Sequence, residues 1–322
     1  MAEISMFDPF LFRPEAVDPE TDQFNLEMAR RMASAPPLHT LKPQQLRDLR
    51  DSGKSIWGPF KRLAEAGERT VPGPKGPVVV RVFVPDKIKG VYLHIHGGGF
   101  MIGRAYERDE SNAEIARQCQ LAVVSVDYRL APENPYPAAP DDCEAAAVWL
   151  VQEAEAEFGV NRLIIGGESV GATLSVVTLL RMRDHHGFTG FAGAKLSYGV
   201  FDLSCTPSLL GWEDRNPIIT CSTMEWFNRS YVSPERFKDP DVSPLYADLS
   251  RLPPALFLIG TMDPLLDDSL FMYARWLAAG NPAQLEVYPG GLHAFDLFPL
   301  KIAWQANQRV LEFLSECIRT PE

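Results

Sequence analysis

Three side chains in the second half of the sequence have the types and order needed for nucleophilic catalysis: Ser169, Asp263 and His293. Ser169 stands in the pattern Gly-x-Ser-x-Gly, after an apolar run at 163–165 and before a helix-forming segment. This pattern is typical of a strained turn that lifts a serine to the top of a parallel sheet. Side chains at the two flanking glycines would collide with the strand and the helix on either side. The sequence therefore predicts that Ser169 is a nucleophile.

The roles of the other two residues follow from acidity. A serine hydroxyl is a poor nucleophile at neutral pH, so a base with a pKa near 6.5 must take its proton, and we assign this role to His293. Asp263 would fix the tautomer of that histidine and stabilise the imidazolium. Asp267 and Asp268 are rival acids, but a place in the first turn of a predicted helix explains both without catalysis.

A run of three glycines, 97–99, follows a predicted strand at 91–95. Such a run leaves backbone N–H groups unobstructed, so that they can point at an anion. A phosphate-binding loop is the alternative, but no Gly-Lys-Ser/Thr follows. We expect the N–H groups of Gly98, Gly99 and Val170 to hold the oxyanion that forms when an acyl group is attacked.

The elements that must position these residues alternate between strands and helices. Predicted strands lie at 78–84, 91–95, 121–127, 163–165, 195–199, 254–260 and 284–288. Strands that alternate with helices predict a parallel sheet, with functional groups at the carboxyl ends of its strands. Each of the three candidate side chains comes just after a strand.

Two stretches outside this alternation have a different character. Residues 1–70 contain no predicted strand, but Phe24, Met28 and Met32 recur at helical spacing. The segment 203–248 lacks strand character, and its aromatic residues include Trp212, Trp226, Phe227 and Tyr231. We interpret this segment as a helical lid over the serine, with a long surface loop as the alternative.

Composition excludes several classes of protein. The 322 residues carry 31 basic and 42 acidic side chains, a net charge of −11, which argues against nucleic acid and anionic membrane surfaces as partners. No run of 18 apolar residues occurs, and the N-terminus lacks a signal-peptide pattern. The five scattered cysteines show no CxxC spacing, so we predict reduced thiols in a cytoplasmic protein.

The histidines other than His293 do not indicate a metal site. His94 and His96 share one face of a strand, but no third ligand is visible. We interpret His94 as a core residue and His96 as the residue that orients the glycine run through a hydrogen bond. His185 and His186 at a helix end are interpreted as solvated. No cofactor and no metal are therefore predicted.

The set of motifs resembles the bacterial hormone-sensitive-lipase-like esterases of the α/β-hydrolase superfamily. The resemblance covers roughly residues 78 to 318, and five motifs carry it: His96-Gly97-Gly98-Gly99-Phe100, Asp127-Tyr128-Arg129-Leu130-Ala131-Pro132-Glu133, Gly167-Glu168-Ser169-Val170-Gly171, Asp263-Pro264-Leu265 and His293-Ala294-Phe295. Relatives usually have Asp and Ala beside the nucleophile, where this chain has Glu168 and Val170. The branched side chain of Val170 is expected to reshape the acyl pocket, while its N–H group remains available.

The resemblance implies an α/β-hydrolase fold, with a mostly parallel eight-stranded sheet, flanking helices and a helical cap. The cap would comprise residues 1–70 and an insertion after strand 6 at 203–248, and the catalytic core residues 71–202 and 249–322. The resemblance also implies a metal-free serine carboxylesterase for short acyl chains, in which Gly98 and Gly99, rather than Gly97, supply oxyanion donors. A small-molecule ester is the expected partner. The exposed edge of the last predicted strand is compatible with a homodimer, as the resemblance also suggests.

Two other functions fit parts of the pattern. The same three side chains could cleave another acyl bond, such as a lactone or an amide, although nothing in the chain marks a peptide groove. A catalytically silent small-molecule receptor on the same scaffold would require a broken triad, whereas Ser169, Asp263 and His293 are all present.

Overall fold

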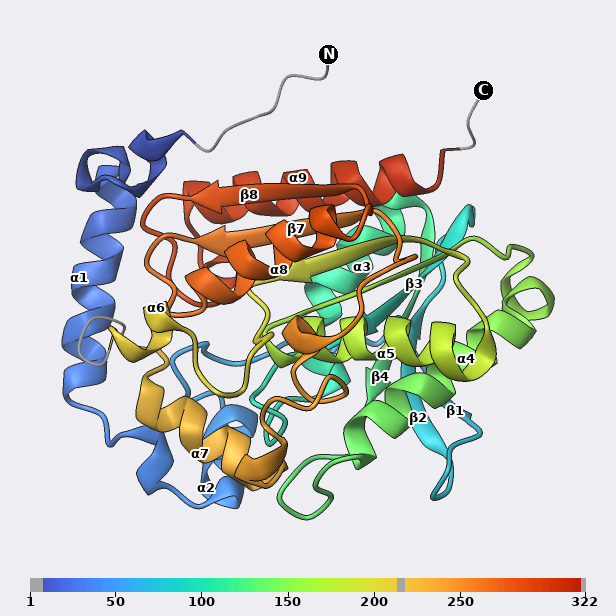
Figure 1. Ribbon diagram of the computed structural model, residues 1–322, viewed down its shortest axis with the longest axis horizontal. Coiled ribbons are helices and arrows are strands. Elements are labelled where there is room, and N and C mark those ends of the chain that lie inside the picture. The colour runs from blue at the N-terminus through green and yellow to red at the C-terminus, as the bar shows by residue number, and fades with distance from the viewer. Residues whose placement is uncertain (1–7, 213–217, 320–322) are drawn as a thin grey trace.

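A computed structural model describes residues 8–212 and 218–319. Eight strands form one sheet in the order β1-β2-β4-β3-β5-β6-β7-β8, and helices cover both of its faces (Figure 1). The pairs β1·β2 and β2·β4 are antiparallel, and the other five pairs are parallel. The predicted α/β-hydrolase sheet of eight mostly parallel strands is therefore confirmed. The strands are β1 (Gly67–Val71), β2 (Val78–Phe83), β3 (Gly90–Ile95), β4 (Leu121–Asp127), β5 (Leu163–Glu168), β6 (Phe191–Ser197), β7 (Ala255–Gly260) and β8 (Ala283–Tyr288).

The central strands are apolar on both faces because each face of the sheet has its own core. In β4, Leu121 and Val123 point to one core, and Ala122 and Val124 point to the other, as the two-residue period of a strand requires. Helices α3 (Asp109–Cys119) and α9 (Lys301–Cys317) complete the first core. Helices α4 (Ala138–Phe158), α5 (Val170–His186) and α8 (Leu266–Ala278) complete the second.

Four further helices gather beside the end of the sheet toward which β7 and β8 point (Figure 1). They are α1 (Pro19–Ala33), α2 (Pro43–Asp51), α6 (Pro207–Leu210) and α7 (Cys221–Tyr231). Helix α1 is fastened to the loop after β8, because Asn25 Nδ2 donates a hydrogen bond of 2.8 Å to the carbonyl of Gly290. The division into cap and core stays a prediction, and residues 1–7, 213–217 and 320–322 of the predicted units lie outside the described residues.

Two elements differ from the sequence-based expectation. Strand β1, with the sequence GERTV, begins inside the stretch for which no strand was predicted. It is a sheet edge with four exposed residues of five, so it lacks the apolar alternation that would have revealed it. The acidic pair Asp141-Asp142 predicts a helix that begins at Asp141, but α4 begins at Ala138, with Pro140 in its first turn. Proline is tolerated there because the first N–H groups of a helix have no intrahelical acceptor.

Within the described residues, we find no helix that is both long enough and apolar enough to cross a membrane.

Candidate active site

Ser169 lies on a sharp turn between β5 and α5. Its backbone adopts φ 54° and ψ −126°, a sparsely populated region for a residue with a side chain. A Cβ atom on Gly167 or Gly171 would lie 2.1 Å from the carbonyl oxygen of Ile95 in β3. The turn is thus pressed against the neighbouring strand, and only glycine on both sides of the serine permits this approach.

The three predicted catalytic side chains meet at the carboxyl ends of β5, β7 and β8. His293 Nε2 lies 3.1 Å from Ser169 Oγ, and His293 Nδ1 lies 2.9 Å from Asp263 Oδ2. The other oxygen of Asp263 accepts the N–H of Leu265 at 2.9 Å. Asp263 is fully buried, and His293 is 6% exposed. The carboxylate therefore has a fixed orientation, and the histidine between it and the serine has little freedom to turn away.

The rival acids Asp267 and Asp268 have other partners. Asp268 is fully buried and accepts hydrogen bonds from the N–H groups of residues 201–202 and from the hydroxyl of Thr206, at 2.7 to 2.9 Å. Burial raises the pKa of the Asp268 carboxyl to about 7. Asp267 accepts the N–H of Ser208 at 2.8 Å. Both lie in the first turn of α8, as predicted, and they fasten the segment after β6 to that helix.

The glycine run lies beside the serine. Gly98 and Gly99 have φ values of 126° and 58°, which favour glycine. A Cβ atom on Gly98 would lie 2.0 Å from the carbonyl oxygen of Ile102, so the loop folds tightly on itself. Val170 is the first residue of α5, and its N–H belongs to the helix end that attracts negative charge. The backbone groups expected to bind an oxyanion thus come from two elements that meet at Ser169.

His96 and His94 behave as the sequence indicated. His96 Nδ1 donates to the carbonyl of Gly97 at 2.8 Å, and the ring stacks on Tyr128 at a centroid distance of 4.2 Å. His94 is buried, with Nδ1 at 2.7 Å from Ser125 Oγ. Burial lowers the pKa of His96, so its ring is neutral at neutral pH.

A buried charge network starts at Glu168, the residue before Ser169. Its carboxylate lies 2.7 Å from Lys195 Nζ, 3.1 Å from His94 Nε2 and 3.6 Å from Arg108 Nε. Arg108 Nη1 continues to Asp296 at 3.0 Å. Two carboxylates thus face two cations, and the network links the end of β5 to the segment after His293.

The side chains of the network remain ionised although they are buried. Burial alone would raise the pKa of the Glu168 carboxyl, but the charges of Arg108 and Lys195 outweigh this effect and hold the pKa well below its usual range. Tyr198 Oη donates to Asp296 Oδ1 at 2.5 Å, and its ring meets the ring of His293 edge-on at 5.0 Å. The network therefore reaches the back of the candidate base through Tyr198.

The motifs give no role to Glu168, but the sequence carries an indication of its pairing with Lys195. Lys195 lies within an apolar strand, and a buried ammonium group requires a partner of opposite charge. Lys195 is aligned with Gly166, so the two-residue period of β5 places Glu168 on the same face as that lysine.

Ser169 and His293 line an apolar cavity of about 220 Å³. Its walls come from the N-terminal segment and from the segment around α7, and they include Met32, Leu41, Leu46, Ile219, Met224 and Phe227. Phe227 packs on the glycine run so closely that a Cβ atom on Gly99 would lie 2.6 Å from its ring. Such a cavity suits an uncharged organic ligand whose polar group lies at the serine.

The strand order and the position of the site at the carboxyl ends of the strands define an α/β-hydrolase. A family model described as the alpha/beta hydrolase fold matches residues 92–297. A hyperthermophilic esterase from the archaeon Pyrobaculum calidifontis is 29% identical, with a TM-score of 0.83 over 94% of this chain and 99% of its own. The thermophilic carboxylesterase EstE1, cloned from a metagenomic library, is 30% identical, with a TM-score of 0.80 over 87% and 99%. A hormone-sensitive lipase from a metagenome library is 28% identical, with a TM-score of 0.81 over 94% and 99%.

This chain belongs to the α/β-hydrolase fold family and, within it, to the hormone-sensitive-lipase-like carboxylic ester hydrolases. The resemblance drawn from the motifs is thus confirmed.

The buried network generates a prediction about stability. Replacing Glu168 with Gln leaves two cations facing one carboxylate, so we expect the free energy of unfolding in urea to fall by about 3 to 5 kcal/mol. Lys195→Met should restore part of this loss when combined with Glu168→Gln, because the double variant buries one fewer unpaired charge. The matched control is Glu225→Gln, which removes an exposed ion pair with Arg229 and should cost less than about 1 kcal/mol. Strictly additive losses in the double variant would contradict the coupling.

Proposed function

We propose that this protein is a serine carboxylesterase that hydrolyses short-chain acyl esters through an acyl-enzyme. The observation that carries the proposal is the continuous hydrogen-bonded series Ser169 Oγ, His293 Nε2, His293 Nδ1 and Asp263 Oδ2, with distances of 3.1 and 2.9 Å. A hydroxyl, a base within hydrogen-bond reach of it and a third group that orients the base are the parts that nucleophilic catalysis needs.

In acylation, Ser169 Oγ attacks the ester carbonyl carbon while its proton passes to His293 Nε2. Asp263 accepts the hydrogen bond from Nδ1–H and stabilises the imidazolium that results. The carbonyl π electrons move to the oxygen, which becomes an oxyanion. When the tetrahedral intermediate collapses, the C–O bond to the alcohol breaks, and the alcohol leaves with the proton held on His293.

The oxyanion binds to the N–H groups of Gly98, Gly99 and Val170. The support for this assignment is the closeness of the glycine run to the serine, since a Cβ atom on Gly97 would lie 3.3 Å from Ser169 Cβ, together with the place of Val170 at the start of α5. Each such donor contributes about 100- to 1,000-fold to the rate when it is fixed in advance.

Deacylation repeats the same proton transfers with water. His293 takes a proton from water, the hydroxide attacks the acyl carbon, and Ser169 leaves with the proton returned by the histidine. The base, the acid and the oxyanion donors therefore each act twice in one turnover. No metal or cofactor enters the proposed steps.

The substrate is a small neutral ester. The apolar walls from the N-terminal segment and the segment around α7 support this part of the proposal, and they also support the assignment of residues 1–70 and 203–248 to a cap. The cytoplasmic location stays a prediction from the sequence.

A homodimer through the edge strand β8 is a further part of the proposal. β8 lies at one end of the sheet and is only partly buried. A free edge of this kind can pair with the same strand of a second copy.

A series of nitrophenyl esters tests the chemistry. We expect activity to be greatest for acyl chains of about two to six carbons, and Ser169→Ala to abolish nearly all of it, because the variant cannot form the acyl-enzyme. Turnover by Ser169→Ala at the rate of the unmodified enzyme would refute the assignment of Ser169 as the nucleophile. A preference for long emulsified triglycerides would refute the substrate class.

The identity of the acid is tested by two matched substitutions four residues apart. Asp263→Asn should lower kcat by about three to four orders of magnitude, because an amide favours the wrong tautomer of His293. Asp267→Asn should change kcat little, since its partner is the N–H of Ser208, which an amide oxygen can still accept. A large loss of kcat in Asp267→Asn and a small one in Asp263→Asn would identify Asp267 as the acid.

Sedimentation measurements test the dimer. We expect the mass of two chains for the unmodified protein and of one chain after Leu285→Pro, which removes an N–H group from β8. Circular dichroism must show that the variant keeps its fold, and a single-chain mass for the unmodified protein would exclude the dimer.

A further inference from the structure

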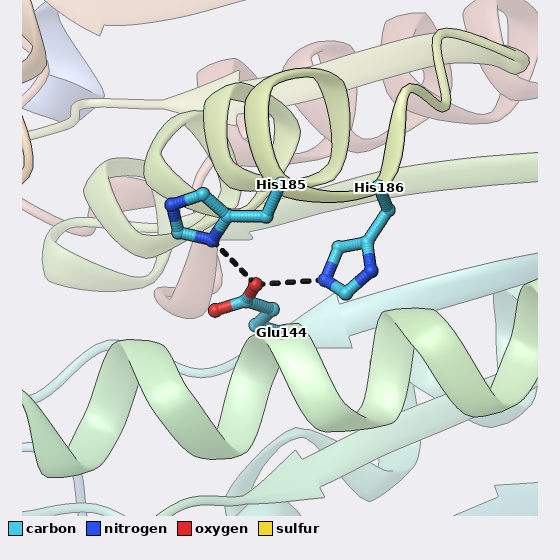
Figure 2. A group of neighbouring side chains, drawn as sticks. All are labelled: Glu144, His185 and His186. Carbon is cyan, nitrogen blue, oxygen red and sulfur yellow. Dashed lines mark hydrogen bonds and ion pairs between the residues drawn. The ribbon is translucent and has the colours of Figure 1, made fainter.

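Three ligand-type side chains converge far from Ser169, where α4 passes the C-terminal end of α5. Glu144 Oε1 lies 2.8 Å from His185 Nδ1 and 2.9 Å from His186 Nε2. Figure 2 shows both rings turned toward this one oxygen, from opposite sides of Glu144. Across residues 8–212 and 218–319, this is the one group of three such side chains whose ligand atoms all lie within 4.8 Å of one another.

We propose that Glu144, His185 and His186 form a zinc site that ties α4 to α5. Two imidazole nitrogens and one carboxylate oxygen, with a fourth position left for water, are a donor set that Zn²⁺ accepts. Ligand atoms around tetrahedral zinc lie about 3.3 Å apart, since each is about 2.0 to 2.1 Å from the ion. The two N···O separations of 2.8 and 2.9 Å are about half an ångström shorter than this spacing, and all three ligand atoms lie within 4.8 Å of one another, so rotations of the exposed histidines can bring them to zinc geometry.

The carboxylate is prepared for this role. Its second oxygen, Oε2, accepts a hydrogen bond of 3.0 Å from Arg181 Nη1, which fixes the group and leaves Oε1 directed at the histidines.

The local charge favours a cation in spite of Arg181. The guanidinium of Arg181 is already matched by Asp241 at 2.5 Å and by Asp141 at 2.9 Å. With Glu144 included, three carboxylates face one cation, a net charge of −2 before the histidines are counted. The C-terminal end of α5 adds the negative end of the helix dipole.

The ligands can adjust, and the site is separate from the proposed chemistry. The side chains of His185 and His186 are 57% and 38% exposed, so they can turn without disturbing the core. Helix α5 has 17 residues, which places its end about 25 Å from the turn that carries Ser169. The ion would therefore stabilise the pair of helices and take no part in ester cleavage.

The test uses Zn²⁺ alone as the probe. EDTA-treated protein is titrated with ZnCl₂ in competition with a chromophoric chelator, and bound metal is counted after dialysis. We expect one ion per chain, bound at least about tenfold more weakly by His185→Asn or His186→Asn, because each loses one of three ligands. Zinc should also raise the Tm of the unmodified protein by several degrees. It should not raise the Tm of the double histidine variant, which carries both His185→Asn and His186→Asn.

His39→Asn is the matched control, since His39 is likewise exposed but lies outside the group, and it should bind zinc as the unmodified protein does. The double histidine variant should hydrolyse esters at the unmodified rate, which separates this test from that of the proposed function. The proposal is overturned if the double histidine variant binds zinc as tightly as the unmodified protein, or if no zinc is retained at micromolar concentrations. A stoichiometry of one ion per two chains would also overturn it, because the ion would then lie between two copies.

Discussion

The close approach of the serine turn to β3 is the constraint on which the rest of the site depends. The carbonyl of Ile95 occupies the space that side chains at positions 167 and 171 would need, so the chain can turn there only with glycine on both sides of Ser169. The same approach places Ser169 against the glycine run that begins two residues after Ile95. A strained backbone is maintained because two buried layers surround it: β5 lies between strands of the sheet, and 14 of the 17 residues of α5 are buried.

The buried ion pairs of Glu168 also help to hold the Ser169 turn in place. A carboxylate at position 168 would be costly in this interior if it stood alone, but Lys195 and Arg108 neutralise it. Because Arg108 also holds Asp296, and Tyr198 bridges Asp296 to the ring of His293, the strand before Ser169 and the loop of His293 share one set of ion pairs. The residue before Ser169 is therefore held by its ion-pair partners on two other elements, β6 and the segment before α3.

The sequence was sufficient for the sheet, for the alternation of elements and for the meeting of Ser169, Asp263 and His293, because each of these leaves a local pattern of apolar runs, glycines and polar residues after strands. It was not sufficient for β1, whose exposed residues carry no period. For the network at Glu168 the sequence gives only one indication, a lysine within an apolar strand, and for the group at Glu144 it gives none. Both join residues 27 to 188 positions apart, so they depend on how distant segments pack. The expected roles of Ser169, Asp263 and His293 follow from their types and order in the sequence, whereas the distances between them come from the structure alone.

The hydrogen bond from Asn25 to Gly290 has a consequence for the timing of folding. It joins residues 265 positions apart, and it braces the loop that carries His293 against a helix made near the start of synthesis. Contacts of such sequence separation form late, because the entropy of closing the long loop must first be overcome. His293 follows β8 in the chain, so it can reach Ser169 only after β8 has been synthesised. The helix that braces its loop is thus made long before the loop itself.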